Sequence, residues 1–349
     1  MTTKSFPTSS MSTLLEKAIY HHSRMRHHPR LWVGLVLILL SVFWLYSTSD
    51  RIHHRLFNKV ASKNGHSSWD SDSTQSEWMK PRSGYLIPPK IWQIILPKGE
   101  KNVQNAVDPD TLKQTTTWLA KNQDHIYTLV GENGGRKFIS RHFNDTILSL
   151  YDSLPNVGMK SDLLRYLLLD IEGGVYTDTD TVALKPVDEW VPEQFRNQTR
   201  LIVGIEFDQR DGGFWADIPH PLQFCQWTIA AAPGHPVFQK MVARVIQSWE
   251  GLVKEHGSAA KPTSFEVMNS TGPAAWTDVA WEYLQETDDT LTTLRNLSSL
   301  GPPRLFGDAL VLPIDGFGMG QPHSGSTNDG SIPNGALVKH LFGGSWRGD

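Results

Sequence analysis

The stretch KSDLLRYLLLDIEGGVYTDTD, residues 160–180, decides the fold more than any other part of this sequence. Its leucines recur at intervals of three and four residues, which predicts a helix, and Ser161 is placed to cap its start. Gly173 and Gly174 are expected to end the helix, because glycine readily adopts the conformation found after a last helical turn. VYTD, residues 175–178, then predicts a strand. The stretch therefore predicts a helix that leads directly into a strand.

The segments before this stretch alternate in the same way. Residues 91–96 and 125–131 are short, apolar and rich in β-branched residues, which predicts two strands. Residues 109–122 between them predict a helix with Pro109 in its first turn. This alternation indicates an α/β domain with a largely parallel sheet.

The segments after it complete the predicted map. Residues 201–207, 309–314 and 336–342 predict further strands, and residues 236–249 predict an amphipathic helix. PLQFCQWTIAAAP, residues 221–233, has a helical pattern of apolar residues, with Cys225 as a buried small hydrophobe. No repeat or low-complexity break interrupts the chain after residue 87, so one domain is expected to reach the end.

Composition excludes several classes of function. The 349 residues carry a formal net charge of only -3, which argues against nucleic acid as a partner. The single cysteine rules out an internal disulfide and zinc sites built on several cysteines. Most of the thirteen tryptophans are expected in the core, although tryptophan also lines sites that bind sugars or bases.

An apolar segment near the start predicts a membrane anchor. Residues 31–49 hold no charged side chain and, as a helix, span about 28 Å, enough for one crossing of a thin bilayer. A cleaved signal peptide is the alternative. We favour a retained signal anchor, because the thirty residues before the apolar segment are longer than an ordinary signal peptide allows.

The anchor divides the chain into four parts. Residues 1–30 are predicted to be a cytosolic tail, 31–49 the transmembrane signal anchor, 50–86 a flexible serine-rich stem, and 87–349 a lumenal catalytic domain. Basic residues flank both sides of the anchor equally, so they do not set its orientation. Four glycosylation sequons beyond the anchor favour a lumenal domain: Asn144, Asn197, Asn269 and Asn296.

The pair Asp178 and Asp180 follows the predicted strand, at the edge where open α/β sheets bind ligands. Two such carboxylates suit Mg²⁺ or Mn²⁺ held jointly with a diphosphate. The pattern DTDTV also fits an aspartate phosphatase, with Asp178 as nucleophile and Asp180 as general acid. That alternative is disfavoured, because phosphatases carry the motif on their first strand and a large part of this domain precedes it. A polar turn after the strand is the third interpretation.

An ordered series of motifs surrounds the pair. PPKIWQ, KSDLLRY, GG-x-Y-x-D-x-D, GIEFDQ, PLQFCQWTI, TGPAAWTD and HLFGGSW follow one another between about Pro88 and Arg347. In this the chain resembles the family 32 glycosyltransferases, a DXD sugar-binding family, and among them the fungal initiation-specific α-1,6-mannosyltransferase type of the Golgi. The resemblance implies a GT-A-type nucleotide-sugar-binding sheet flanked by helices, GDP-mannose as donor and Mn²⁺ (or Mg²⁺) as cofactor.

The resemblance also implies a metal and donor site. By family position Asp180 is a metal ligand, Asp178 contacts the metal or the donor ribose, and His340 completes the metal site. Asp162 and Arg165 face the donor sugar, although residues one helical turn apart also suit a surface ion pair. Asp178, Asp180 and Arg165 are accordingly expected to be catalytic.

Other expected contacts concern the base, the diphosphate and the acceptor. Trp92 is expected against the guanine ring, with a core role as the alternative. Ser345 and Trp346 are expected to hydrogen-bond the diphosphate. Glu206 and Asp208 are candidates for acceptor binding, with a structural role as the alternative. A glycan on Asn269, directly before TGP, would have to avoid the acceptor cleft.

The implied reaction is retaining transfer of mannose to a mannose hydroxyl of an N-glycan, initiating an α-1,6 outer chain. A front-face displacement is expected, since no second carboxylate stands out as a covalent nucleophile. The alternatives are transfer to inositol phosphoceramide and a non-catalytic subunit of a mannan-building complex. The implied location is the Golgi membrane, as a single-pass type II protein and glycoprotein with a lumenal catalytic domain, within a mannosyltransferase complex or alone.

Overall fold

The computed structural model describes residues 84–97, 112–215, 218–257 and 261–343. The chain divides into two units, 1–59 and 60–349, and every described residue belongs to the second. No helix within the described residues has the length and apolar character that a bilayer crossing requires. The predicted tail and anchor, most of the stem, and Pro109, Ser345 and Trp346 lie outside the described residues.

Strands and helices alternate along the described chain. The strands are β1 (Lys90–Ile94), β2 (Ile126–Val130), β3 (Gly174–Thr177), β4 (Thr181–Ala183), β5 (Leu201–Asp208), β6 (Leu222–Phe224), β7 (Thr228–Ala231), β8 (Arg304–Phe306), β9 (Ala309–Leu312) and β10 (Val338–His340). The helices are α4 (Thr115–Lys121), α5 (Glu132–His142), α6 (Asp145–Ser153), α7 (Val157–Glu172), α8 (Pro236–His256), α9 (Ser264–Ser270), α10 (Pro273–Thr287) and α11 (Ile314–Phe317), with short 3₁₀ helices at Val187–Glu189, Glu193–Phe195 and Leu294–Leu297.

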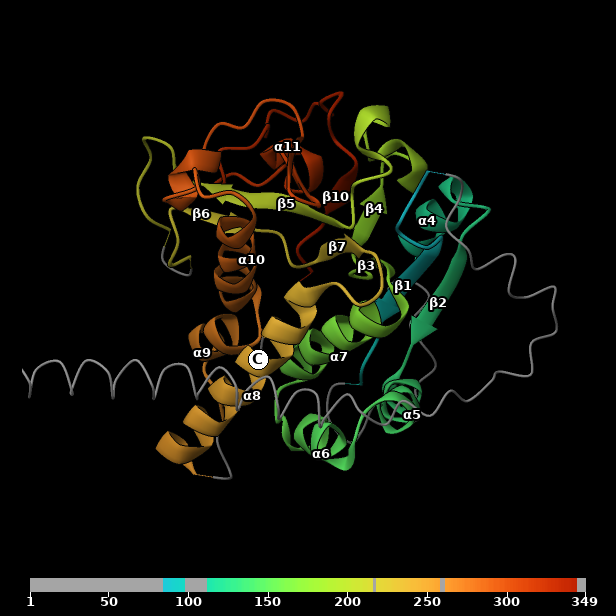
Figure 1. Ribbon diagram of the computed structural model, residues 1–349, viewed down its shortest axis with the longest axis vertical. Helices are drawn as coiled ribbons and strands as arrows, with labels where there is room; N and C mark the ends of the chain where they lie inside the picture. Colours follow the sequence, from blue (N-terminus) through green and yellow to red (C-terminus); the bar gives the residue numbers. More distant parts are fainter. Residues whose placement is uncertain (1–83, 98–111, 216–217, 258–260, 344–349) are drawn as a thin grey trace, which may run out of the picture. The chain divides into compact units, whose positions relative to one another are not determined.

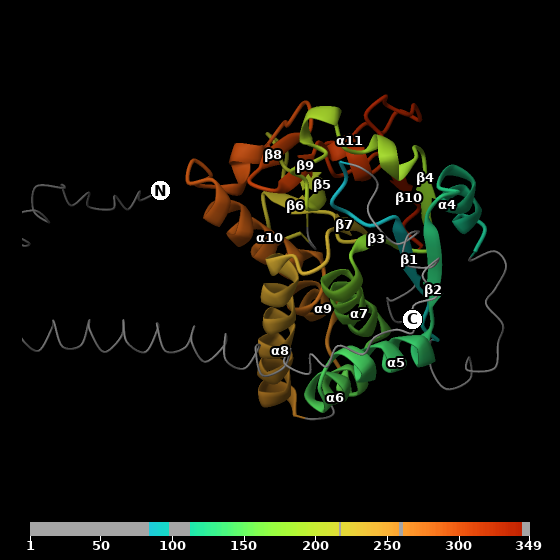
Figure 2. The same cartoon turned by 45° about the vertical axis from the view of Figure 1, so that its right-hand side comes forward.

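A mixed sheet forms the centre of the domain, with strand order β2-β1-β3-β7-β5-β9-β8 and β6 paired to β5. Helices α7, α8 and α10 cover one side, and α11 lies on the other with the small β4–β10 sheet (Figures 1 and 2). The α/β class is confirmed. The expectation of a largely parallel sheet is wrong: among the described strands, β1–β2, β1–β3 and β5–β9 pair in parallel, whereas β3–β7, β5–β6, β5–β7 and β8–β9 pair antiparallel.

The antiparallel pairs arise where the chain returns without a crossover helix. Residues 221–233, expected to be helical, instead form β6 and β7, which both run antiparallel to β5. β7 also pairs with β3 and so connects the two halves of the sheet. All residues of β6 and β7 are buried. A short segment buried on every side has no polar face, so its pattern does not distinguish strand from helix.

Helix α7 positions the site and begins earlier than the sequence predicted. Asn156, not Ser161, caps it, because its side chain accepts hydrogen bonds from the backbone N–H groups of Gly158 and Met159 at 2.7 and 3.3 Å. Ser161 lies inside the helix. Gly173 ends the helix as predicted, with φ at +62°, a conformation that strongly favours glycine. The chain therefore turns sharply from α7 into β3.

Aromatic side chains fill the core, as the composition indicated. Trp118 and Trp190 are fully buried, with ring centroids 6.0 Å apart, and Trp190 packs edge-on against Phe317 at 5.0 Å. Phe317 also lies against Gly204 of β5, where an added Cβ would come within 2.6 Å of the Phe317 ring. The close approach of α11 to the sheet therefore requires glycine at this position.

Replacing Gly204 with alanine is expected to lower the free energy of unfolding by about 1–3 kcal/mol, because the new methyl group overlaps Phe317 in a packed core. Chemical denaturation of the full chain, followed by tryptophan fluorescence, measures this. Gly251→Ala is the control: it lies on the exposed surface of α8 with no atom within 4 Å of the new Cβ, and should leave stability unchanged or raise it. Equal effects of the two changes would contradict the packing argument.

A second prediction concerns Asp170, a buried carboxyl in α7 whose Oδ1 has no hydrogen-bond partner among the described residues. Burial raises its pKa to about 6. Because the folded state resists ionisation, stability is lost as pH rises from the ordinary carboxyl pKa of 3.8 to about 6, and the loss then remains.

Asp170→Asn removes this ionisation. It should raise the free energy of unfolding by about 1–3 kcal/mol at pH 7.5, and the gain should shrink towards pH 4. Denaturation curves of the two proteins across that pH range measure the difference. A gain that does not change with pH would show that ionisation of Asp170 is not its cause.

Candidate active site

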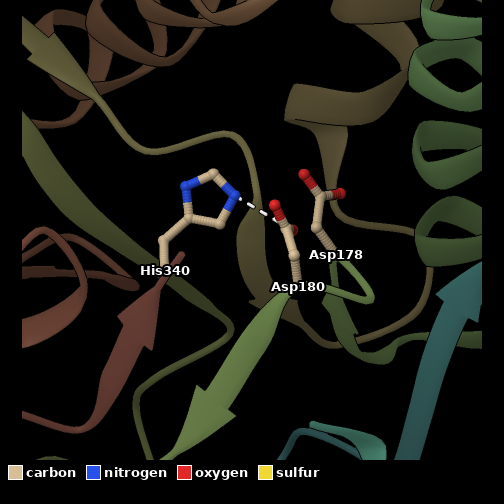
Figure 3. Close-up of side chains that lie close together, drawn as sticks. All are labelled: Asp178, Asp180 and His340. Atoms are coloured by element: carbon tan, nitrogen blue, oxygen red, sulfur yellow. Dashed lines mark hydrogen bonds and ion pairs between the residues drawn. The ribbon is translucent and has the colours of Figure 1, made fainter. Parts of the chain in front are cut away.

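The two aspartates lie in a turn at the carboxyl end of β3. The backbone N–H of Asp178 donates to the carbonyl of Trp227 at 2.8 Å, and the Thr181 hydroxyl donates to the carbonyl of Asp178 at 2.6 Å. The strand thus ends at Thr177, and β4 starts directly after Asp180. Both carboxylates face the space beside this turn (Figure 3).

His340 reaches the same turn from the far end of the sequence. It is the last residue of β10, which pairs antiparallel with β4 so that His340 lies opposite Thr181. Its Nε2 lies 3.1 Å from Asp180 Oδ1, as Figure 3 shows. The ring stacks on Trp227, with centroids 4.6 Å apart and planes at 14°. Two strands and one aromatic ring therefore fix the imidazole beside the aspartates.

Asp178, Asp180 and His340 come together as predicted. Their ligand atoms all lie within 4.8 Å of one another. Two carboxylates and one imidazole are a donor set that suits Mn²⁺ and also admits Mg²⁺. The described residues offer three ligands, fewer than either metal takes, so the coordination sphere would also have room for a diphosphate. The residues present therefore fit the implied metal.

Neighbouring groups orient the two carboxylates. The Tyr176 hydroxyl donates to Asp178 Oδ1, and the backbone N–H of Gly343 donates to Asp180 Oδ2 at 2.7 Å. Burial would raise the pKa of Asp180, but hydrogen bonds from His340 and Gly343 outweigh it and hold that pKa below the ordinary value. Asp180 is therefore ionised at neutral pH, as a metal ligand must be.

A buried charged cluster lies behind the turn. Arg165 of α7 is 2.9 Å from Asp162 and 3.6 Å from Asp178, so it links helix and turn. Asp162 and Arg165 are each only 5% exposed, so the alternative of a surface ion pair is wrong. The guanidinium also lies over the ring of Tyr176, 4.4 Å from its centroid, and donates to the carbonyl of Gln226 at 3.0 Å.

The pKa values of Asp162 and Arg165 are both raised, but for different reasons. Burial raises the pKa of Asp162 to about 6, although Arg165 and the Thr271 hydroxyl oppose that rise. Burial disfavours the charged form of Arg165, but Tyr176, Asp178 and Asp162 outweigh it and raise the pKa of the guanidinium. Arg165 is therefore a permanent positive charge between two carboxyl groups.

Two residues that the sequence analysis did not assign complete this cluster. The Thr271 hydroxyl donates to Asp162 Oδ2 at 2.7 Å. The Gln226 amide donates to the Tyr166 hydroxyl at 2.6 Å and to the carbonyl of Thr271 at 3.0 Å. Both lie in motifs already noted, TGPAAWTD and PLQFCQWTI. The signal was therefore present, but nothing in the sequence shows that these motifs meet at α7.

Trp92 does not join the aspartates. It is the third residue of β1, and its indole N–H donates to the carbonyl of Gly173 at 2.8 Å. Gly173 immediately precedes β3, whereas Asp178 immediately follows it. This hydrogen bond favours the structural alternative for Trp92.

Glu206 lies in a cluster of buried polar side chains on β5 and β6. It accepts a hydrogen bond from the Gln223 amide at 3.1 Å, and Gln321 and His340 are also near it. Burial raises its pKa to about 7, against the opposing effects of Gln223, His340 and Gln321. Glu206 is therefore a buried carboxyl close to the candidate ligand His340.

Asp208 has a structural role. Its carboxylate accepts hydrogen bonds from the Ser298 hydroxyl and the Ser299 N–H, both at 2.7 Å, and it pairs with Arg210 at 3.3 Å. Because these donors already occupy both oxygens, the geometry favours the structural alternative over acceptor binding.

The four sequons differ in accessibility. Asn197 and Asn296 are exposed, whereas Asn144 and Asn269 are half-buried. Asn144 caps α6, and the side chain of Asn269 donates to the carbonyl of Phe265 at 2.8 Å. The sequon of Asn269 ends at Thr271, which contacts Asp162. Asn197 and Asn296 are therefore the more open of the four positions.

The sequence has relatives of known class. Residues 109–196 match the family model described as a glycosyltransferase sugar-binding region containing a DXD motif. An initiation-specific alpha-1,6-mannosyltransferase of Schizosaccharomyces pombe is 36% identical over 273 residues, which cover 75% of this chain and 64% of that protein. One of Candida albicans is 33% identical over 263 residues, which cover 68% of this chain and 67% of that protein.

Among solved structures, the PaToxG glycosyltransferase aligns with a TM-score of 0.40 and 17% identity, covering 70% of this chain and 80% of that one.

The match to the Schizosaccharomyces pombe relative spans slightly less than two thirds of that protein's length. The Candida albicans match combines more than 30% identity with two thirds of the relative's length. The chain therefore belongs to the glycosyltransferase family whose sugar-binding region contains the DXD motif, among the relatives of the initiation-specific alpha-1,6-mannosyltransferases.

Proposed function

We propose that this protein is a retaining, metal-dependent mannosyltransferase that moves mannose from GDP-mannose to a mannose hydroxyl of an N-glycan and so initiates an α-1,6 outer chain. The observation that carries the proposal is the convergence of Asp178, Asp180 and His340 beside the buried pair Asp162–Arg165. The names of the relatives support the sugar and the linkage. The proposal includes a GT-A-type organisation of the sheet.

The donor side of the site uses the turn after β3. Asp178, Asp180 and His340 would hold Mn²⁺ (or Mg²⁺), which supplies a Lewis acid that neutralises the departing diphosphate. By family position Asp162 would face the donor sugar and use its remaining acceptor capacity for the sugar hydroxyls, beside its contacts to Arg165 and Thr271. Arg165 keeps Asp162 and Asp178 in place, because it contacts both carboxylates at once. Ser345 and Trp346, outside the described residues, are proposed to contact the diphosphate.

The acceptor side uses the polar cluster around Glu206. The reacting hydroxyl of the acceptor mannose would hydrogen-bond the Glu206 carboxyl, with Gln223 and Gln321 beside it. Because burial raises the pKa of Glu206 to about 7, this carboxyl would donate or accept that hydrogen bond at neutral pH. The acceptor hydroxyl would attack the donor mannose from the same face that the diphosphate leaves, so the configuration of the mannose would be retained. The leaving diphosphate would assist removal of the proton from the acceptor hydroxyl.

Two alternatives stay open. Transfer to inositol phosphoceramide would use the same donor machinery with a different acceptor. A non-catalytic subunit of a mannan-building complex is less consistent with a complete set of Asp178, Asp180 and His340. We further propose a single-pass type II protein of the Golgi membrane with a lumenal catalytic domain, supported by the apolar segment 31–49 and by the sequons after it.

The reaction is tested with the full-length chain in detergent, incubated with labelled GDP-mannose and either a high-mannose N-glycan or inositol phosphoceramide. We expect one mannose to be added to the N-glycan, and methylation analysis to show a new 6-substituted mannose. Asp180→Asn is the negative control and should reduce turnover by roughly a hundredfold or more, because a ligand charge is lost at the leaving group. Preference for the lipid would favour the first alternative, and no transfer to either would contradict the proposal.

Metal removal gives a separate test. Excess EDTA is expected to abolish transfer and added Mn²⁺ to restore it. Isothermal titration should show Mn²⁺ binding that His340→Ala weakens roughly tenfold or more, since one of three protein ligands is lost. His256→Ala, which changes an exposed histidine in α8, is the matched control and should bind Mn²⁺ normally. Full activity in EDTA would rule out the metal role.

A further inference from the structure

A cavity of about 420 Å³ opens at the carboxyl end of β5, the strand that also carries Glu206. Its lining includes Phe207 and Asp208 at the end of β5, Phe214 and Trp215 in the following loop, and His323. Phe207 directly follows Glu206, and His323 lies two residues after Gln321. The pairing of β5 with β6 shifts register between Ile205 and Phe207, an irregularity that typically redirects side chains near functional sites.

The chain segments that carry Glu206 and Gln321 therefore also border the cavity. Its volume lies within the range of small-molecule sites.

Aromatic rings form a stack along the cavity wall. His323 lies between Phe207 and Trp215: its ring centroid is 6.4 Å from that of Phe207 and 4.5 Å from that of Trp215, with planes at 28° and 18°. Phe207 is buried, whereas Trp215 is 49% exposed and Phe214 is 74% exposed. The core thus supports a flat aromatic surface that remains open to solvent. Such a surface suits the C–H face of a pyranose ring.

The charges of the cavity are already neutralised. Among the described lining residues, the permanently positive side chain is that of Arg210, and its guanidinium pairs with the buried Asp208 at 3.3 Å. Its backbone has a φ of +46°, an uncommon conformation for a residue other than glycine, and Arg295 donates to its carbonyl at 3.4 Å. Burial lowers the pKa of His323, so this ring is neutral at physiological pH. An uncharged ligand fits these conditions better than a phosphate does.

We propose that this cavity, with Trp215 as its platform, binds a second sugar ring of the oligosaccharide acceptor, one residue away from the mannose that reacts at Glu206. The inference rests on the proposed function, because it takes an oligosaccharide as the acceptor. The inference makes Trp215, instead of Asp208, the residue that contacts the acceptor and determines its specificity. Asp208 has a structural role: it pairs with Arg210 in the loop that carries Trp215 and accepts hydrogen bonds from Ser298 and Ser299.

The test compares long and short acceptors. With the full-length chain, Trp215→Ala should raise the KM for an α-linked mannose tetrasaccharide roughly five- to tenfold, because one stacking contact is lost. The KM values for methyl α-mannoside and for GDP-mannose should change less than twofold. Trp215→Tyr should restore most of the affinity for the tetrasaccharide. Phe265→Ala, which changes a similarly exposed aromatic residue in α9, is the matched control and should leave all three KM values unchanged.

Two kinetic results would overturn the inference. An equal rise of KM for the tetrasaccharide and for methyl α-mannoside would show a general structural effect. A rise confined to GDP-mannose would show that the cavity holds the nucleotide.

Direct binding separates this inference from the proposed function. Saturation-transfer NMR is recorded with the mannose tetrasaccharide and the full-length chain, without donor. Signals that the wild-type protein shows and Trp215→Ala loses support the subsite even if no mannose is transferred. Absence of signals with the wild-type protein overturns it, even if transfer from GDP-mannose is observed.

Discussion

The site depends on the ion pairs that the buried guanidinium of Arg165 makes with two carboxylates. It lies inside the fold between Asp162 and Asp178, which belong to a helix and to the turn after a strand. Removing one partner of such a buried charged pair typically costs about 3–5 kcal/mol, because the other charge is left uncompensated. The position of α7 against the β3 turn is therefore set by charge as well as by apolar packing.

Three distant parts of the chain meet around this charge. Helix α7 supplies Arg165, the turn after β3 supplies the aspartates, and β10 supplies His340 through its pairing with β4. The small β4–β10 sheet has only three residues in each strand, yet it places His340 next to an aspartate 160 positions earlier. Backbone pairing therefore brings the third candidate ligand to the site, and the stacked Trp227 fixes its ring.

The sequence predicted local features of this arrangement well. The end of α7 at Gly173 follows from the conformation that glycine allows, and the pair Asp178 and Asp180 follows from the residues directly around it. Both signals reside in a few adjacent residues. The third member, His340, was expected only from the family resemblance, because it lies 160 positions further along the chain.

Features that depend on distant neighbours were not predictable. Residues 222–224 and 228–231 are buried on all sides, so the pattern of this segment was compatible with a helix, and the antiparallel strands β6 and β7 were therefore missed. Asp208 resembled a site residue, but its donors Ser298 and Ser299 lie some ninety positions away. Sequence spacing does not contain these long-range contacts. The cap of α7 is a different, local error: Ser161 was expected to cap the helix, whereas Asn156, an equally good capping residue, starts it five positions earlier.

Thr271 has two roles that cannot be changed separately. It is the third residue of the sequon at Asn269, and its hydroxyl holds Asp162 in the buried cluster. Serine would keep both the sequon and a hydroxyl donor, whereas any other residue would remove the sequon and leave Asp162 without this partner. Variation at this one position therefore changes a sequon and the hydrogen bonding of a buried carboxyl together. A substitution of Asn269 would remove the sequon while keeping the hydrogen bond from Thr271 to Asp162.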